Sequence, residues 1–162
     1  MALVAVLSEC SQRVVIRDRA LDHMARYRQL SWYSREAGGQ LFGTVSSNEV
    51  VVLTATGPYR GDQRWRTSYR SNPRAAQRTI DEKARQGCLY LGEWHTHPED
   101  YPDASGADFD AMEKLQRASN TRLSNLLLVI QGRALGASGL AMYSFGGGGP
   151  TQWEIQGALA AE

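Results

Sequence analysis

The sequence has few cysteines, almost no net charge and no long hydrophobic run. Its two cysteines, Cys10 and Cys88, form no C-x-x-C pair and predict no disulfide framework, so a reducing cytoplasm suits them best. The formal net charge of +1 gives no reason to expect nucleic acid or an anionic membrane as a partner. No segment approaches the roughly 18 apolar residues of a membrane span, and residues 1–10 lack the charged start of a signal peptide. We therefore expect a cytoplasmic protein with no membrane and no nucleic-acid partner.

Length and patterning predict one α/β domain. A chain of 162 residues, 42% hydrophobic and 22% charged, is long enough to bury a core without disulfides. Apolar spacing and capping residues predict three helices, over residues 18–33, 72–85 and 106–119. Apolar and β-branched runs predict strands over residues 14–16, 40–46, 50–56, 89–97, 126–130, 139–145 and 152–155. Residues 146–149, all glycine, are expected to form a flexible hinge. Helices interspersed among strands favour one mixed sheet and no second domain.

Two histidines one residue apart form the most informative motif. His95 and His97 lie at the end of a predicted strand, where alternate side chains point to the same side. Ser105 and Asp108 follow closely, so two imidazole nitrogens and one carboxylate can converge on one ion. Three protein ligands leave one position for a water, which is typical of a catalytic zinc rather than a structural one. We therefore predict His95, His97 and Asp108 as zinc ligands.

Each part of this motif also has a structural interpretation. A lone H-x-H pattern is often a pair of histidines on a strand surface. Ser105 and Asp108 match a capping box, in which both side chains bond backbone N–H groups at a helix start. Phe109, Met112 and Leu115 follow at helical spacing, so a helix is expected here in either case. The interpretations are compatible, because a helix N-terminus can anchor both a serine and an aspartate.

With an upstream glutamate, the motif resembles the JAMM (MPN-plus, JAB) metalloproteases. The pattern H-x-H-x7-S-x-x-D is complete, and Glu36 opens the segment EAGGQLFG, which is similar to the family's E-x-x-G-x-L-x-G. Ala104 stands where many members have proline, which affects the loop rather than the chemistry. An accidental match of all these residues at the family's spacing is improbable, so the resemblance favours the metal site.

The resemblance implies a fold as well as a site. It covers nearly the whole chain and implies a single MPN (cytidine deaminase-like) domain over residues 1–162, with a core over about residues 12–157. The expected architecture is a mixed, curved β-sheet packed with about three helices.

The resemblance also implies a cofactor and two catalytic roles. One Zn²⁺ per chain would lower the pKa of water to about 7. Glu36, beside a flexible Gly38-Gly39 turn, is the expected base for that water, and Ser105 the expected hydrogen-bond donor to the oxyanion. Two other glutamates lie closer to the histidines. Glu93 shares their strand face and could hold an imidazole from behind, whereas Glu99 is expected to be a solvated surface charge.

Residues 59–70 interleave arginines with aromatic residues, which allows three interpretations. A surface for single-stranded nucleic acid is one of them. A loop with buried aromatic anchors and solvated arginines is favoured over it. The third, which fits the family better, is an edge that pairs with an extended substrate tail.

The function implied by the resemblance is that of a zinc isopeptidase. Family members hydrolyse the bond after the C-terminal residue of ubiquitin or ubiquitin-like proteins. The short chain resembles prokaryotic members encoded beside E1/E2-like enzymes, including those of CBASS antiphage systems, so a ubiquitin-like or C-terminally conjugated protein is the expected substrate. Processing of a sulfur-carrier protein and a metal-free MPN scaffold remain alternatives. Zinc-dependent nucleotide deamination is disfavoured, because its H-x-E and P-C-x-x-C signatures are absent.

Overall fold

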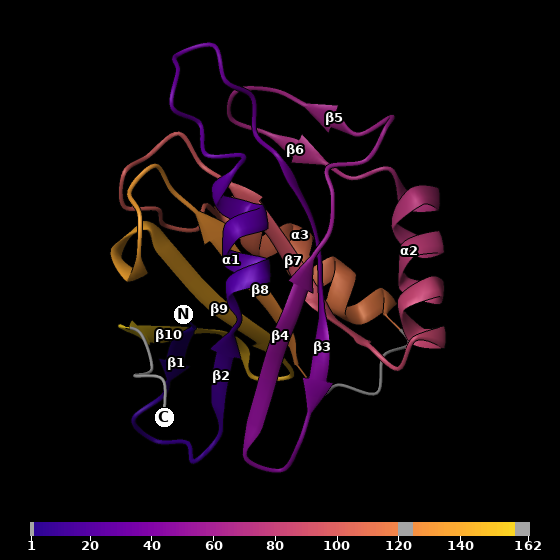
Figure 1. Cartoon of the computed structure of the whole chain (residues 1–162), viewed down its shortest axis with the longest axis vertical. Coiled ribbons are helices and arrows are strands. Elements are labelled where there is room, and N and C mark those ends of the chain that lie inside the picture. The colour runs from indigo at the N-terminus through magenta and orange to yellow at the C-terminus, as the bar shows by residue number, and fades with distance from the viewer. Residues whose placement is uncertain (1, 120–124, 158–162) are drawn as a thin grey trace.

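A closed, mixed sheet of eight strands forms the body of the protein (Figure 1). The structure is a computed structural model that describes residues 2–119 and 125–157, so the expected domain limits at residues 1 and 162 lie outside the described ranges. The strands of the sheet are β1 (Leu3–Val6), β2 (Arg13–Ile16), β3 (Gly38–Val45), β4 (Glu49–Ala55), β7 (Leu89–Thr96), β8 (Leu126–Gln131), β9 (Leu140–Gly146) and β10 (Gly149–Gln156). Their order around the sheet is β1-β10-β9-β8-β7-β3-β4-β2, with β2 pairing back to β1.

Closure of the sheet differs from the expected open, curved sheet. Strand β1 pairs with β10 on one side and with β2 on the other, and so removes both edges. The sequence analysis assigned no strand to Leu3–Val6, because four apolar residues carry too little periodicity to define one. The β1–β10 pairing also joins segments from opposite ends of the chain. A local sequence pattern cannot predict a pairing between such distant segments. Two pairs in the sheet are parallel, β2 with β4 and β7 with β8, so the sheet is mixed as predicted.

Three α-helices accompany the sheet, as predicted. They are α1 (Asp18–Ala25), α2 (Pro73–Arg85) and α3 (Gly106–Ala118), with a short 3₁₀ turn, η1 (Ala137–Gly139). Helix α2 begins as expected, with Pro73 at its first position and the Asn72 side chain accepting from two backbone N–H groups. Among the described residues, no helix is long and apolar enough to cross a bilayer.

Helix α1 differs from the prediction at both ends. Arg17 occupies the N-cap position without a side-chain cap, and Asp18, the predicted cap, is the first helical residue. The helix stops at Ala25 rather than near residue 33. Residues 26–37 instead form an irregular segment, because their polar groups find tertiary partners that a helix would not allow.

The two larger apolar clusters pack helices against the sheet. The larger one joins α1 to the strands around Trp94, which is 1% exposed and donates its indole N–H to the carbonyl of Thr56 (2.8 Å). The second packs α3 against β8 and β9 and includes Met112, Leu128 and Phe145. Helix α2 packs against β7 and β3. Burial of this apolar surface is the main favourable contribution to folding.

The connections between strands agree with the sequence only in part. The predicted strands over residues 40–46 and 50–56 form the hairpin of β3 and β4. The arginine-rich stretch contains two short strands, β5 (Gln63–Arg64) and β6 (Tyr69–Arg70), which form a separate hairpin above the sheet (Figure 1). The expected glycine hinge is wrong: Gly146 and Gly149 pair with each other as the ends of β9 and β10, so the glycines form a tight hairpin turn.

The pairing of β3 with β7 brings the two halves of the predicted motif together. Gly38 lies opposite His95, and Gln40 lies opposite Glu93. On its other side, β3 approaches the end of β4 so closely that a Cβ atom on Gly39 would lie 1.8 Å from the carbonyl oxygen of Thr56. The contact is with backbone, which cannot move aside as a flexible side chain would.

We therefore expect Gly39→Ala to reduce the free energy of unfolding by about 3 kcal/mol, the upper end of the usual cost of overpacking. Gly148→Ala is the matched control, because a Cβ atom there meets nothing within 4 Å. Denaturant unfolding followed by tryptophan fluorescence would measure both variants. Equal stability of the two would contradict this account of the β3–β4 approach.

Candidate metal centre

Three side chains from two elements converge at the end of β7. His95 belongs to the strand, His97 follows it directly, and Asp108 lies in the first turn of α3. The Nε2 atoms of the two histidines are 3.1 Å apart. Each also lies 3.2 Å from a different carboxylate oxygen of Asp108. The sequence analysis predicted these three residues as ligands, and the structure brings their donor atoms together.

The triangle of donor atoms fits a small metal ion. A tetrahedral ion with ligand bonds of 2.0–2.1 Å separates its ligands by about 3.3 Å, close to the distances found here. Two imidazoles and one carboxylate would supply three ligands to such an ion and leave one position for water. These residues could therefore hold a metal of the catalytic kind.

Charges at the cluster favour a cation at its centre. Burial by itself would raise the pKa of Asp108, but hydrogen bonds from His95 and His97 lower this pKa well below its usual range. Burial lowers the pKa of His97, but the carboxylates of Asp108, Glu36 and Glu99 together outweigh this effect, so the pKa is raised. The cluster therefore favours a positive charge at its centre, which a metal ion would supply in place of a proton.

Asp108 and Ser105 also form the predicted capping box of α3. The Ser105 Oγ accepts a hydrogen bond from the Asp108 backbone N–H (3.2 Å), and the Asp108 Oδ2 accepts one from the Ser105 N–H (2.8 Å). The cap and the ligand triangle share one carboxylate. The capping bonds orient the carboxylate and so hold it against the histidines.

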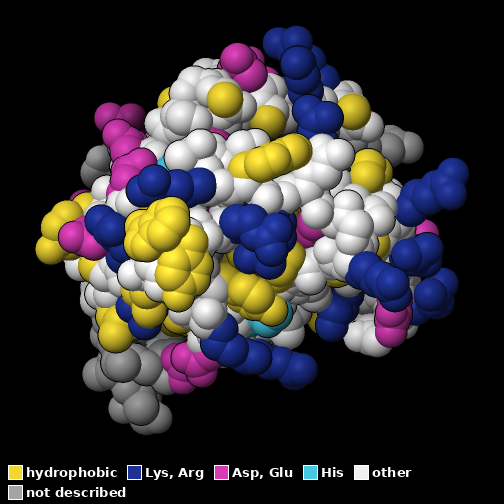
Figure 2. Space-filling view, turned by 90° about the horizontal axis from the view of Figure 1, so that it is seen from above, with side chains coloured by type: hydrophobic (Ala, Val, Ile, Leu, Met, Phe, Trp, Pro, Cys, Tyr) yellow, Lys and Arg dark blue, Asp and Glu magenta, His cyan; other side chains and the backbone are white. Residues whose placement is uncertain are grey.

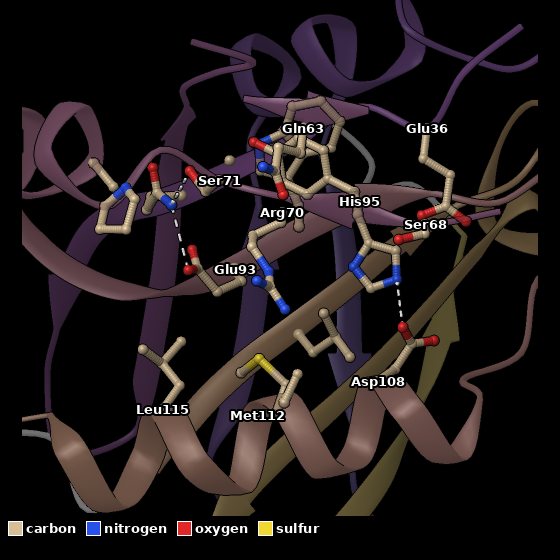
Figure 3. A pocket seen from close by; sticks show the side chains of 18 of the residues that line it. Glu36, Gln63, Ser68, Arg70, Ser71, Glu93, His95, Asp108, Met112 and Leu115 are labelled. Carbon is tan, nitrogen blue, oxygen red and sulfur yellow. Dashed lines mark hydrogen bonds and ion pairs between the residues drawn. The ribbon is translucent and has the colours of Figure 1, made fainter. Parts of the chain in front are cut away.

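Glu36 lies close to the cluster in a buried position. It is 4% exposed, and Figure 3 shows its carboxylate directed toward His95 and Asp108 from the opposite wall. Its backbone N–H donates to the Trp65 carbonyl (2.7 Å), and its own carbonyl accepts from Arg64 Nε (2.7 Å). Burial raises the pKa of Glu36 to about 7, with His97 acting in the opposite direction. A carboxylate with this pKa can accept and release a proton near neutral pH.

A buried network that the sequence analysis missed ties the Glu36 segment to the histidine strand. Thr96, between the two histidines, points the other way, accepts the Ala37 N–H (3.0 Å) and donates to Gln29 Oε1 (2.9 Å). Gln29 in turn donates to the carbonyls of Ser34 (3.2 Å) and Arg66 (2.8 Å). Gln29 is 1% exposed, yet nothing local in the sequence marks it, because its partners are distant in the chain.

Of the two other glutamates, Glu93 differs from its predicted role and Glu99 agrees in part. Glu93 does not support an imidazole: it accepts a hydrogen bond from Gln40 Nε2 (3.3 Å). Glu99 is half exposed, as expected for a surface charge, but its Oε1 lies 3.6 Å from His97 Nδ1. The glutamate that lies behind an imidazole is therefore Glu99. Strand alternation had allowed this place for Glu93.

The cluster of His95, His97 and Asp108 opens into a groove with a volume of about 1520 Å³. Helices α2 and α3 form its sides, and β3, β7 and the β5–β6 hairpin complete it. Seen from above (Figure 2), arginines and lysines share this face with hydrophobic side chains, and a histidine is only partly visible between them. The side chain of His95 is 13% exposed.

Residues 59–70 are anchored by their aromatic residues, in agreement with the favoured interpretation. Tyr59 donates to Gln40 Oε1 (2.6 Å), and Tyr69 donates to the Gly38 carbonyl (2.8 Å). Most arginines of the stretch are exposed. Trp65 is an exception among the aromatics, since it is 53% exposed at the rim of the groove.

Comparisons with known proteins identify the family of the chain. The family described as prokaryotic homologs of the JAB domain matches residues 18–145, and the chain belongs to this family. A "CD-NTase/cGAS isopeptidase" of Vibrio cholerae is 33% identical over 123 residues, 74% of this chain and 76% of the relative. Proteins of the same name from Pseudomonas aeruginosa and Escherichia coli are each 32% identical, over 71% and 63% of this chain and 75% and 67% of their own lengths.

A solved structure supports the fold alone. The solution structure of a Desulfitobacterium hafniense protein superposes with a TM-score of 0.61, covering 85% of this chain and 87% of that one. The two sequences are 17% identical, which is too low to carry a functional argument.

Substitutions at Ser105 and Asp108 should separate the effect of losing a metal ligand from the effect of losing the helix cap. We expect Asp108→Ala to lose bound metal, because it removes one of three ligands, and to lose the cap as well. Ser105→Ala should keep the metal and lose only the cap, at a cost of about 1 kcal/mol. Elemental analysis of the purified variants measures the first effect, and melting with and without a chelator measures the second. Full metal content in Asp108→Ala would contradict the coordination scheme.

Proposed function

We propose that this chain is a zinc-dependent isopeptidase that hydrolyses the bond after the C-terminal residue of a conjugated protein. The observation that carries this proposal is the triangle of His95, His97 and Asp108 facing Glu36 at one end of a groove. Two nitrogens and one carboxylate suit zinc with an open position, at one ion per chain. Membership of the JAB family and the isopeptidase names of three relatives support the same activity.

Glu36 is the proposed base of the reaction. A zinc ion held by the three ligands would supply Lewis acidity, which lowers the pKa of water and polarises a carbonyl. Glu36 accepts the proton of the attacking water and then delivers it to the leaving amine. Proton transfer by a placed side chain typically contributes about 10²–10⁴-fold to the rate.

Ser105 is the proposed donor to the oxyanion. Its Oγ already accepts the Asp108 N–H, so the position of the oxygen is set while its hydroxyl hydrogen stays available. One such hydrogen bond is typically worth about 3–4 kcal/mol in the transition state. A nucleophilic role would need a histidine base, but the two nearby histidines are assigned to the metal.

The proposed substrate is a CD-NTase joined to a target through its C-terminus. Three relatives carry names that pair CD-NTase/cGAS with isopeptidase, and the sequence resembles members encoded beside E1/E2-like enzymes in antiphage systems. The reaction would then release the nucleotidyltransferase from its target in the bacterial cytoplasm.

Glu36→Gln tests the assignment of the base. The amide keeps the shape of the side chain but cannot accept a proton, so we expect turnover to fall by at least about 10²-fold while zinc remains near one per chain. Glu82→Gln, on the exposed face of α2 and outside the groove, is the matched control, and its turnover should change little. If Glu99→Gln abolished turnover and Glu36→Gln did not, the assignment would be wrong.

Cleavage of a defined fusion tests the substrate. We expect the purified protein to release a reporter joined through an amide bond to the C-terminus of the CD-NTase encoded nearest to its gene. Mass spectrometry should locate the cut directly after the last CD-NTase residue, because the scissile carbonyl must reach both the ligand triangle and Ser105. A cut inside the folded CD-NTase, or none by zinc-loaded protein, would count against the proposal.

A further inference from the structure

Ser105, the proposed donor to the oxyanion, is an exposed residue at the start of α3. The next residue is Gly106, where a Cβ atom would meet nothing within 4 Å, so packing on that side does not fix the serine. A hydroxyl can assist a reacting carbonyl only from a fixed position, since a misplacement of about 1 Å can lower a rate about 10²-fold. The position of Ser105 must therefore be set by the chain on either side of it.

Residues 98–104 connect the second histidine of the cluster to Ser105. The first part of this loop is held by its backbone, because the Glu99 carbonyl accepts the N–H of Arg133 (2.7 Å). Pro102 is buried and holds the middle of the loop. Beyond Pro102, directly before the serine, the loop is held by a side chain of β9.

That side chain is Tyr143. Its hydroxyl donates to Asp103 Oδ1 (2.5 Å) and accepts the backbone N–H of Ala104 (3.2 Å). The same N–H also lies 3.0 Å from Asp103 Oδ1, so the three groups form a closed set of hydrogen bonds. Burial, and after it the bond to Asp103, raises the pKa of Tyr143 to about 12. The hydroxyl therefore keeps its proton at neutral pH and remains a donor.

The ring of Tyr143 contacts the chain on the other side of Ser105. It packs edge-on against Phe109, with ring centroids 5.4 Å apart and ring planes at 80°. The Phe109 N–H in turn donates to the Ser105 carbonyl (3.1 Å). Tyr143 is 2% exposed and belongs to the apolar cluster of α3, β8 and β9, so its own position is fixed by packing.

The residue type at position 104 makes the hydroxyl contact possible. A proline there would have no N–H to donate, and its ring would restrict both its own backbone and that of the residue before it. Ala104 has the N–H but leaves the backbone free to move. The hydrogen bonds of Tyr143 supply the restraint that the alanine lacks.

We propose that Tyr143 is a positioning residue, which sets the place of the Ser105 hydroxyl by holding the chain on both sides of it. The proposal rests on the proposed isopeptidase function and adds a residue that acts through Ser105 without touching the substrate. The alternative is a purely structural role, in which Tyr143 stabilises the packing of α3 and has no specific effect on Ser105. The two roles differ in how substitutions at Tyr143 and Ser105 combine.

Removal of the hydroxyl alone tests the role. We expect Tyr143→Phe to lower kcat for the CD-NTase reporter fusion roughly tenfold with little change in KM, because the Ser105 hydroxyl is then less well placed in the transition state. In the Ser105→Ala background, Tyr143→Phe should change kcat by less than about twofold, because the group that it positions is absent. Tyr27→Phe, in the other apolar cluster and outside the groove, is the matched control and should leave kcat unchanged. Melting temperatures of the variants would exclude misfolding as the cause.

Substitutions of Asp103 separate the hydrogen bonds from the ring contact. Asp103→Ala removes the acceptor of the Tyr143 hydroxyl and should reproduce the loss of kcat. Asp103→Asn keeps an acceptor oxygen and should recover most of it. Zinc affinity, measured by competition with a chelator, should stay within about twofold of the wild-type value in Tyr143→Phe, because all three ligands remain. A loss of zinc as severe as in Asp108→Ala would place the effect at the metal and overturn the proposal.

Hydrogen exchange tests the contact without turnover. The Ala104 N–H donates to the Tyr143 hydroxyl, so Tyr143→Phe should speed its exchange by roughly fivefold or more, as for loss of one hydrogen bond. The Ser105 amide should follow it, whereas the amides of β3 should keep their protection. Exchange is followed by NMR on the zinc-loaded protein. Unchanged exchange at both residues would show that the hydroxyl does not hold the loop.

The outcomes separate this proposal from the proposed function. If the wild-type protein cleaves the fusion but Tyr143→Phe has a normal kcat, the positioning role is wrong and the isopeptidase stands. A further loss of roughly tenfold on adding Tyr143→Phe to Ser105→Ala would show a structural role and would also overturn the proposal. If no fusion is cleaved but exchange at Ala104 and Ser105 depends on Tyr143, the tyrosine holds the serine and the isopeptidase is wrong.

Discussion

The pairing of β3 with β7 is the constraint on which the site depends. It aligns Gly38 with His95, and Thr96 bonds the Ala37 N–H from the strand face opposite the histidines. This register determines how far Glu36 lies from the ligand triangle. A shift of the strand register by one residue would turn both histidines to the other face of the sheet. The hydrogen bonds that stabilise the fold therefore also bring the side chains of the site together.

Structural and chemical roles coincide at the start of α3. The Asp108 carboxylate accepts the Ser105 N–H as part of a helix cap and also completes the donor triangle. A group held by several partners loses little entropy when a metal binds, which favours a precise site. The cost is that a substitution here disturbs both stability and metal binding. The two effects can be separated only through Ser105, which shares the cap but not the triangle.

The groove combines a rigid part with a segment that lies outside the main sheet. Its floor belongs to β3 and β7, which are held in the closed sheet, whereas one wall comes from residues 59–70, anchored through Tyr59 and Tyr69. Rigid strands thus carry the reacting groups, and a segment outside the main sheet lies over them. Loops placed on a rigid scaffold commonly carry recognition, and the exposed Trp65 and Arg70 fit that pattern.

The sequence by itself determined the features that depend on near neighbours. The spacing of His95 and His97, the capping box of α3 and the start of α2 follow from strand alternation and local hydrogen bonds, which a short window of residues contains. Tertiary structure alone decided the rest. Closure of the sheet by β1, the early end of α1 and the burial of Gln29 all depend on partners distant in the chain. Glu93 shares the histidines' strand parity, yet it bonds Gln40, because alternation gives the face of a side chain and only packing selects its partner.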